Sequence, residues 1–118
     1  MRMWCVNPSW MCRKHLLGEH LELHMLVDCI KANKKIDGFL VNGLIEINSI
    51  VKRHSEIVNE MLSRGYQHKT PLEFDWRRYK FKNLGFIDRL HNIRVLTTRC
   101  KECNNGYEKL YHTRSVSV

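Results

Sequence analysis

The sequence predicts an all-α fold, built as one domain over residues 1–118. Apolar side chains recur at helical spacing in three segments, residues 9–32, 46–63 and 86–103. Turn-forming residues separate these segments. A chain of 118 residues with 43% hydrophobic and 27% charged residues is typical of one globular domain. We therefore expect a compact three-helix single domain with an extended N-terminal lead-in and irregular basic connectors.

The first helix is expected from Ser9 to Ala32, because Pro8 resists helix continuation and Ser9 can cap the helix that follows. Gly18 in its middle costs about 1 kcal/mol relative to Ala, so we expect a close packing or docking contact there. Apolar residues spread around much of this helix and indicate burial on more than one side: Leu16, Leu17, Leu21, Leu23, Leu26, Val27 and Ile30.

The second helix is expected from Glu46 to Ser63, with Gly65 as its terminator. The basic, turn-rich residues 33–43 before it predict a loop, and residues 66–82 after it predict an irregular segment. A third helix is expected from Phe86 to Cys103, where Asn104-Asn105-Gly106 ends it. The tail beyond holds Tyr107, Lys109, Tyr111, His112 and Arg114, and we expect its last residues to be disordered.

The charge balance points to a polyanionic partner. Twenty Lys and Arg face twelve Asp and Glu, a formal net charge of +8, which favours nucleic acid over an anionic membrane surface. No stretch approaches the ~20 apolar residues of a membrane-spanning helix. The five cysteines are an odd set and the start lacks an apolar signal core. We expect a cytoplasmic protein without membrane contact, in the host cytoplasm if a phage or virus encodes it.

A polar cluster on the first helix is the leading candidate for chemistry. His15, Glu19 and Glu22 stand at i, i+4 and i+7, so their side chains share one helix face near the lead-in. By itself this pattern also fits solvated surface residues, because ionised carboxylates avoid burial unless they are paired.

Two segments resemble a known enzyme family. The run His15-Leu16-Leu17-Gly18-Glu19-His20-Leu21-Glu22 resembles the H-L-x-x-E-x-x-E signature on the first helix of the phage endonuclease V type of pyrimidine dimer DNA glycosylase. Lys52-Arg53 through Arg64-Gly65-Tyr66 and Lys69 resembles the second helix of that family. The two segments cover about half of the chain, in the order in which the family carries them.

The resemblance implies an all-helical enzyme that cuts the glycosylic bond of a cyclobutane pyrimidine dimer in double-stranded DNA. It then nicks the resulting abasic site by β-elimination. The family's nucleophile is an N-terminal α-amine twenty-one residues before the catalytic glutamate, and the same count back from Glu22 reaches Met1. Arg2 is too bulky for ordinary methionine removal, so we expect Met1 to stay in place. An α-amine titrates near 7.7–8.0 and a lysine near 10.4, so the amine is the better nucleophile at neutral pH.

The resemblance also assigns the supporting residues. His15 positions the substrate or the amine, and Glu19 orients its neighbours by hydrogen bonding. We expect a monomer that uses no cofactor or metal. DNA contacts are expected from the matched segments and from a basic stretch interleaved with aromatics: Arg2, Arg53, Arg64, Lys69, Trp76, Arg77, Arg78 and Lys80.

Departures and alternatives stay open. Leu21 and Met25 stand where the family has basic residues, and the connector of residues 33–46 is shorter than the family's. The lesion could also be an abasic site or an oxidised pyrimidine. One alternative function is a non-catalytic DNA-binding module in which Glu22 is structural.

The other alternative is a small zinc-binding protein. His20 and His24 form H-x-x-x-H on a helix, and Cys100-x-x-Cys103 could combine with Cys5 and Cys12. No second short cysteine pair accompanies Cys100-x-x-Cys103, so we assign no metal ligands.

Overall fold

The computed structural model describes the backbone of residues 1–116 and the side chains of residues 1–111. The prediction of an all-α fold is confirmed, but the expected number of helices is wrong. The described residues form five α-helices and three short 3-10 helices: η1 Pro8–Trp10, α1 Arg13–Lys31, α2 Asp37–Val41, η2 Ile47–Ser49, α3 Ile50–Ser63, η3 Trp76–Arg78, α4 Arg89–Arg99 and α5 Lys101–Val116.

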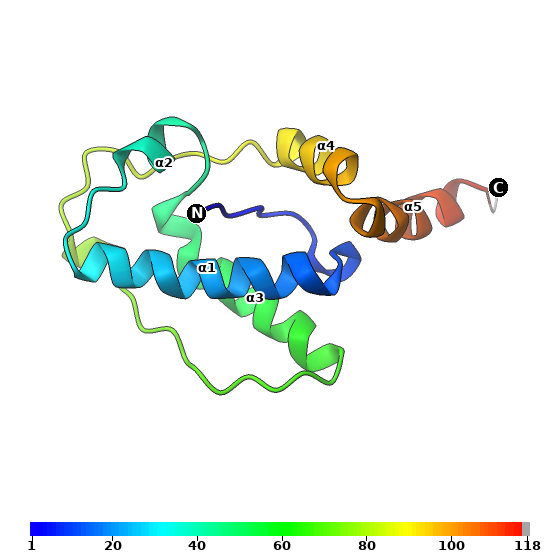
Figure 1. Cartoon of the computed structure of the whole chain (residues 1–118), viewed down its shortest axis with the longest axis horizontal. Helices are drawn as coiled ribbons and strands as arrows, with labels where there is room; N and C mark the ends of the chain where they lie inside the picture. The colour runs from blue at the N-terminus through cyan, green and yellow to red at the C-terminus, as the bar shows by residue number, and fades with distance from the viewer. Residues whose placement is uncertain (117–118) are drawn as a thin grey trace.

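The core lies where α1 and α3 cross and where the lead-in runs beside them (Figure 1). Helix α3 buries one stripe of residues spaced three and four apart, as expected for a helix with one face on the core. Helix α1 buries Leu16, Leu23, Leu26, Val27 and Ile30. The lead-in contributes buried side chains as well, so it is a structural part of the domain: Met3, Trp4 and Val6.

The first and second helices begin later than the sequence predicted. Pro8–Trp10 forms η1, and the Cys12 sulfur accepts the hydrogen bond that caps α1. Residues Ile47–Ser49 likewise form η2 before α3 starts. Both helices end near the predicted residues. Asn33 after α1 and Gly65 after α3 have φ of 56° and 82°, the left-handed conformation that terminates helices.

The C-terminal third differs most from the prediction. Asp88 caps α4, whose last residue is Arg99, and Cys100 then adopts an extended conformation. Helix α5 follows and runs straight through Asn104-Asn105-Gly106, where we expected an end. Gly106 is present for close approach, because a Cβ there would collide with the backbone carbonyl of Trp10. The tail is therefore helical to Val116, whereas the end of the expected disordered tail and the side chains of His112 and Arg114 lie outside the described residues.

Two connectors complete the fold. The predicted loop of residues 33–43 contains the short helix α2. Residues 66–82 are irregular apart from η3, as predicted, and belong to a long segment between α3 and α4. In the part of the chain that the structure describes, no helix has both the length and the apolarity to cross a membrane.

Candidate active site

The lead-in is fixed against α4 and the segment before η2. The Met3 amide donates to the Leu44 carbonyl at 2.8 Å, and the Asn92 side-chain amide donates to the carbonyls of Trp4 at 2.9 Å and Met3 at 3.4 Å. Asn92 is only 2% exposed. A buried amide that satisfies two backbone carbonyls holds the chain direction of the lead-in.

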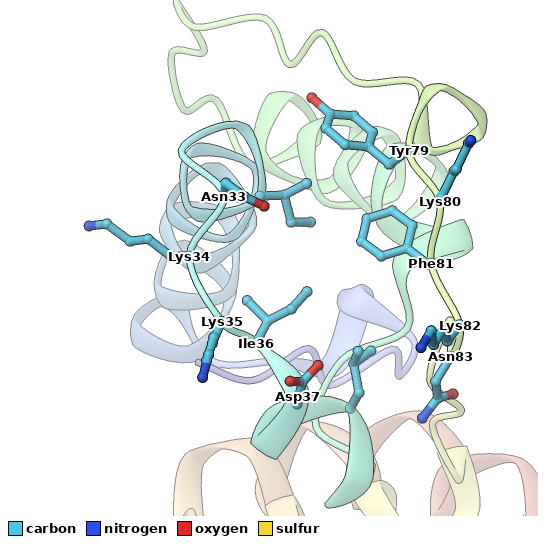
Figure 2. Close-up of a pocket in the computed structure, with 12 residues that line it drawn as sticks. Asn33, Lys34, Lys35, Ile36, Asp37, Tyr79, Lys80, Phe81, Lys82 and Asn83 are labelled. Atoms are coloured by element: carbon cyan, nitrogen blue, oxygen red, sulfur yellow. The ribbon is translucent and has the colours of Figure 1, made fainter.

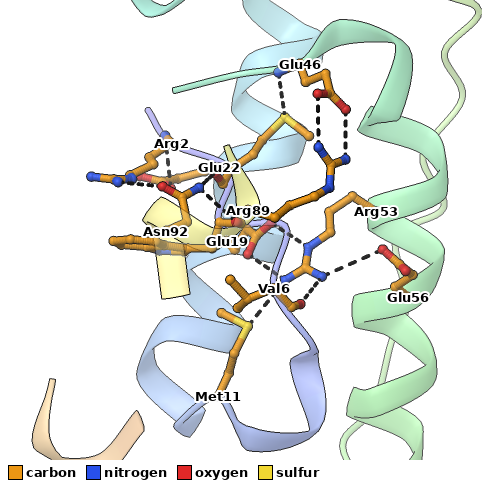
Figure 3. Close-up of polar contacts among 12 residues, drawn as sticks. Arg2, Val6, Met11, Glu19, Glu22, Glu46, Arg53, Glu56, Arg89 and Asn92 are labelled. Carbon is orange, nitrogen blue, oxygen red and sulfur yellow. Dashed lines mark hydrogen bonds and ion pairs between the residues drawn. The ribbon is translucent and has the colours of Figure 1, made fainter. Parts of the chain in front are cut away.

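These contacts bring the start of the chain to Glu22. The backbone amide of Arg2 donates to Glu22 Oε2 at 3.3 Å (Figure 3). One residue spans at most about 3.6 Å, so the nitrogen of Met1 lies within about 7 Å of that carboxylate oxygen.

Arg2 points away from Glu22 at its guanidinium end. Its Nη2 donates to Asn92 Oδ1 at 2.8 Å, and its Cζ lies 4.0 Å from the centre of the Trp4 ring. Burial, followed by the positive charge of Arg99, lowers the pKa of Arg2. The positive charge of Arg2 still lies close enough to the Glu22 carboxylate for the two charges to interact.

A pocket of about 360 Å³ opens over this face of α1. Apart from the backbone of α1 itself, no described atom lies within 4 Å of the position where a Cβ on Gly18 would be, so the close packing expected there is absent and α1 lies open to the pocket. Its lining joins the lead-in to the predicted helix face: Arg2, Trp4, Lys14, His15, Gly18, Glu19 and Glu22.

Glu19 supports the floor of the pocket and is fully committed to Arg53. The two side chains are 0% and 2% exposed, and Arg53 Nε and Nη2 donate to the carboxylate at 2.7 Å and 2.9 Å. Arg53 Nη1 also donates to the Val6 carbonyl at 2.5 Å. Burial by itself lowers the pKa of Arg53, but the bonds and charge of Glu19 outweigh it and raise that pKa. The pair joins α1, α3 and the lead-in.

His15 lines the pocket but turns its Nδ1 toward sulfur. Nδ1 lies 3.1 Å from Cys12 Sγ and 3.8 Å from Cys103 Sγ, and the ring meets Trp4 edge-on at 6.0 Å. Burial, followed by the charge of Lys14, lowers the pKa of His15. A neutral ring in this position forms a wall of the pocket.

The comparison with protein families identifies the scaffold. The model of the family described as pyrimidine dimer DNA glycosylase matches residues 1–74, which include the lead-in, α1 and α3. The chain belongs to this family. No curated protein and no solved structure matches the chain significantly.

Two residues expected to contact DNA make structural contacts in this family member. Arg53 is buried, so it cannot reach a phosphate without opening the core. Arg64 pairs with Glu60 at 2.7 Å and donates through Nη2 to the carbonyls of Pro8 at 3.0 Å and Met11 at 2.7 Å. It therefore fastens η1 to the end of α3. The donors of Arg53 are all used inside the core, so this residue is not available to DNA in the structure. Arg64 keeps 21% of its side chain exposed and stays a predicted DNA contact.

The other predicted contacts are accessible. Lys69 and Lys80 are exposed, and the side chains of Arg77 and Arg78 are 75% and 84% exposed. Trp76 is half-buried, with Arg77 over its ring at 5.0 Å. This stretch lies at the C-terminal end of α1, beside Lys31. Nine residues of helix, about 14 Å, separate that end from Glu22, a span of some four base pairs.

A second pocket of about 420 Å³ lies next to this stretch (Figure 2). The rings of Tyr79 and Phe81 turn toward the cavity, while the Lys34 and Lys80 side chains point away from it. It contains no residue of the predicted catalytic set. Its cationic rim fits a phosphate backbone better than it fits a reacting sugar.

Sequence reasoning missed three features of the site. Lys14 lines the Glu22 pocket from about two helical turns away on α1, and Asn92 holds the lead-in from a helix outside the matched family region. Cys12 lies beside His15, and Cys100 and Cys103 approach both of them. The sequence signal for this last group is Cys12-x-x-His15, which has the same spacing as Cys100-x-x-Cys103. Cys5 stays apart, and burial, together with the nearby charge of Glu19, raises its pKa to about 12.

Proposed function

We propose that the chain is a DNA glycosylase with abasic-site lyase activity, acting on pyrimidine dimers through the Met1 α-amine and Glu22. The observation that carries this proposal is the hydrogen bond from the Arg2 amide to Glu22, because it anchors the first residue beside a carboxylate. Family membership supports the substrate class. Double-stranded DNA bearing the lesion is the proposed partner, and the proposed working state is a monomer.

The contrast between the two carboxylates supports the assignment of Glu22. Glu19 is buried and neutralised by Arg53, so it has no capacity left for a substrate. Glu22 is half-buried and lines the pocket. A carboxylate in that position can stabilise positive charge on a sugar that enters the pocket.

The proposed reaction begins when the neutral amine attacks C1′ of the damaged nucleotide. The bond from C1′ to the base breaks, and the base leaves with its electron pair. The amine then loses a proton, the C1′–O4′ bond opens with a proton passing to O4′, and an imine remains. Glu22 stabilises the charge at C1′ during the first step and then takes a proton from C2′. The electrons of that C–H bond expel the 3′ phosphate, and water hydrolyses the imine.

Binding to DNA is proposed to combine a cationic pocket with the distant basic stretch. Arg2 and Lys14 flank Glu22, and their charge suits the phosphates on either side of an extruded nucleotide. The exposed cations of the Trp76–Lys80 stretch can contact the backbone further along, where the half-buried ring of Trp76 can also stack on a base. Leu21 and Met25 are 60% and 47% exposed on α1, so this helix offers apolar contact where the family has cations.

Borohydride trapping on duplex DNA that carries a cyclobutane dimer tests the proposal. We expect a covalent adduct on the Met1 amine, and no adduct or base release after the amine is acetylated. Glu22→Gln should keep the fold and DNA binding but lose base release, because it removes the charge and preserves the shape. Glu108→Gln, an exposed carboxylate on α5, is the matched control and should retain activity. An adduct on a lysine, or full activity of the acetylated protein, would end the proposed mechanism.

A further inference from the structure

Two groups of side chains converge as metal ligands do, and of their members only His15 also lines the Glu22 pocket. The thiol cluster consists of Cys12, His15, Cys100 and Cys103, and the histidine cluster consists of His20, His24, His54 and His68. Within each cluster every residue offers one ligand atom, and these atoms all lie within 4.8 Å of one another. Each cluster supplies four donors, the number that a closed zinc site uses.

The thiol cluster has the edge lengths of a zinc tetrahedron. With Zn–S bonds of about 2.3 Å and Zn–N bonds of about 2.0–2.1 Å, two sulfurs lie about 3.8 Å apart and a sulfur and a nitrogen about 3.5 Å apart. Cys12 Sγ and Cys100 Sγ are 3.8 Å apart, and His15 Nδ1 lies 3.1 Å and 3.8 Å from the sulfurs of Cys12 and Cys103. The distances bracket the expected values.

The backbone around the thiol cluster is arranged to support thiolates. The amides of Cys12, His15 and Cys103 donate to cluster sulfurs at 3.2 Å, 3.4 Å and 3.4 Å. Such donors stabilise the negative charge of bound thiolates and orient the ligands. Two short motifs, Cys12-x-x-His15 and Cys100-x-x-Cys103, open α1 and α5 at their positive ends.

The histidine cluster has the geometry of four imidazoles on one ion. Zn–N bonds of about 2.0–2.1 Å give nitrogen separations of about 3.3 Å, and ring centres about 1.1 Å further out lie about 5.2 Å apart. The Nε2 atoms of His24 and His54 are 3.2 Å apart. Five centroid separations within the cluster lie between 4.8 Å and 5.1 Å.

Two buried ring nitrogens in the histidine cluster have no hydrogen-bond partner among the described residues. They are His20 Nε2 and His68 Nε2. An unpaired buried polar atom is costly, so two of them facing the same point call for a ligand.

We propose that the chain binds two structural zinc ions, one in the thiol cluster and one in the histidine cluster. Four protein ligands leave no open position, so neither ion takes part in the glycosylase chemistry. The thiol site joins the start of α1 to the junction of α4 and α5. The histidine site joins α1 and α3 to the long segment between α3 and α4, which has little secondary structure to hold it. Tetrahedral coordination favours zinc over copper(II).

The wild-type chain, purified with zinc present and desalted, tests the proposal without any substitution. Elemental analysis should find two zinc ions per chain. X-ray absorption at the zinc edge should show three sulfur and five nitrogen ligands over the two ions, as the clusters contain. Thiol titration of the native chain should leave the three cluster cysteines protected until a chelator removes the metal.

Variants then assign the ions to the clusters. Cys100→Ser with Cys103→Ser should lower the content to one zinc with nitrogen ligands only. His68→Gln should lower it to one zinc with three sulfur ligands. Cys29→Ser and His91→Gln lie outside the clusters and should keep two ions.

A folded wild-type chain that takes up no zinc would overturn the proposal, and so would a disulfide between Cys12 and Cys100 as the native state. A single ion with no sulfur ligands would overturn the thiol site, and a single ion with three sulfurs would overturn the histidine site. These outcomes are read on the wild type, so they hold even if a variant fails to fold.

Discussion

Replacement of Arg53 by methionine should be the most destabilising change to a charged residue near the pocket. The carboxylate of Glu19 is 0% exposed and loses both of its charged hydrogen bonds in Arg53→Met. Breaking a buried ion pair by removing one partner costs about 3–5 kcal/mol, because the remaining charge stays desolvated. The Val6 carbonyl also loses its donor, which adds about 1–2 kcal/mol.

Urea unfolding followed by helix circular dichroism at pH 7 measures this loss as a lower midpoint with an unchanged slope. The matched control is Arg77→Met, whose side chain is 75% exposed and which should change stability by less than about 0.5 kcal/mol. The double variant Glu19→Leu with Arg53→Met should recover most of the loss, because no buried charge remains. The double variant should remain less stable than the wild type only by the cost of the unpaired Val6 carbonyl.

Two results would refute this reasoning. One is a free energy of unfolding of Arg53→Met within about 1 kcal/mol of that of the Arg77→Met control. This would mean that Glu19 is hydrated or protonated in the variant without a cost in stability. The other is a double variant as unstable as the single one, which would make packing rather than charge the cause.

Three further predictions concern stability and binding. Arg89, followed by the hydrogen bonds of Ser49 and Ile87, lowers the pKa of Glu46 to about 2. The stability from this pair is therefore complete above about pH 4.5 and is lost as the pH falls toward 2. Since Arg89 is 46% exposed, solvent screening weakens the pair, and we expect the wild type to be more stable than Arg89→Gln by about 1–2 kcal/mol at pH 6. Urea midpoints of the two proteins should differ at pH 6, and this difference should vanish at pH 2. Gly106→Ala should lower the thermal midpoint, because its Cβ would collide with the Trp10 carbonyl, and an unchanged midpoint would mean that α5 shifts freely. DNA affinity measured by fluorescence anisotropy should fall steeply between 50 mM and 200 mM salt, and a flat response would rule out a phosphate-dominated interface.

The sequence was a good guide to elements whose signal is local. The periodic stripe of α3 and the terminating Gly65 predicted a helix end that the structure reproduces. The spacing of His15, Glu19 and Glu22 correctly placed all three on one face, where they line one pocket. Helical spacing is a property of the chain itself, so it needs no knowledge of tertiary neighbours.

Features that depend on neighbours far along the chain were not predictable in the same way. Arg53 belongs to a basic pair that is typical of a DNA contact, and only the packing of α3 on α1 shows that Glu19 faces it. Gly106 resembles a helix end until the close approach of η1 is known. His68 comes from an irregular segment with no spacing relation to the other histidines. The spacing Cys12-x-x-His15 is visible in the sequence, but nothing local to it shows that His15 faces Cys103.

Asn92 sets a limit on how this enzyme family can be divided into modules. Its amide holds the carbonyls of Met3 and Trp4 and the guanidinium of Arg2, yet it belongs to α4, beyond the 74 residues that the family model covers. A fragment that ends after the matched region would keep Glu22 but lose Asn92, and with it the hydrogen bonds that hold Arg2, Met3 and Trp4 in place. The proposed catalytic site therefore depends on both halves of the chain, and grafting the matched half onto another scaffold would require a substitute for this one buried amide.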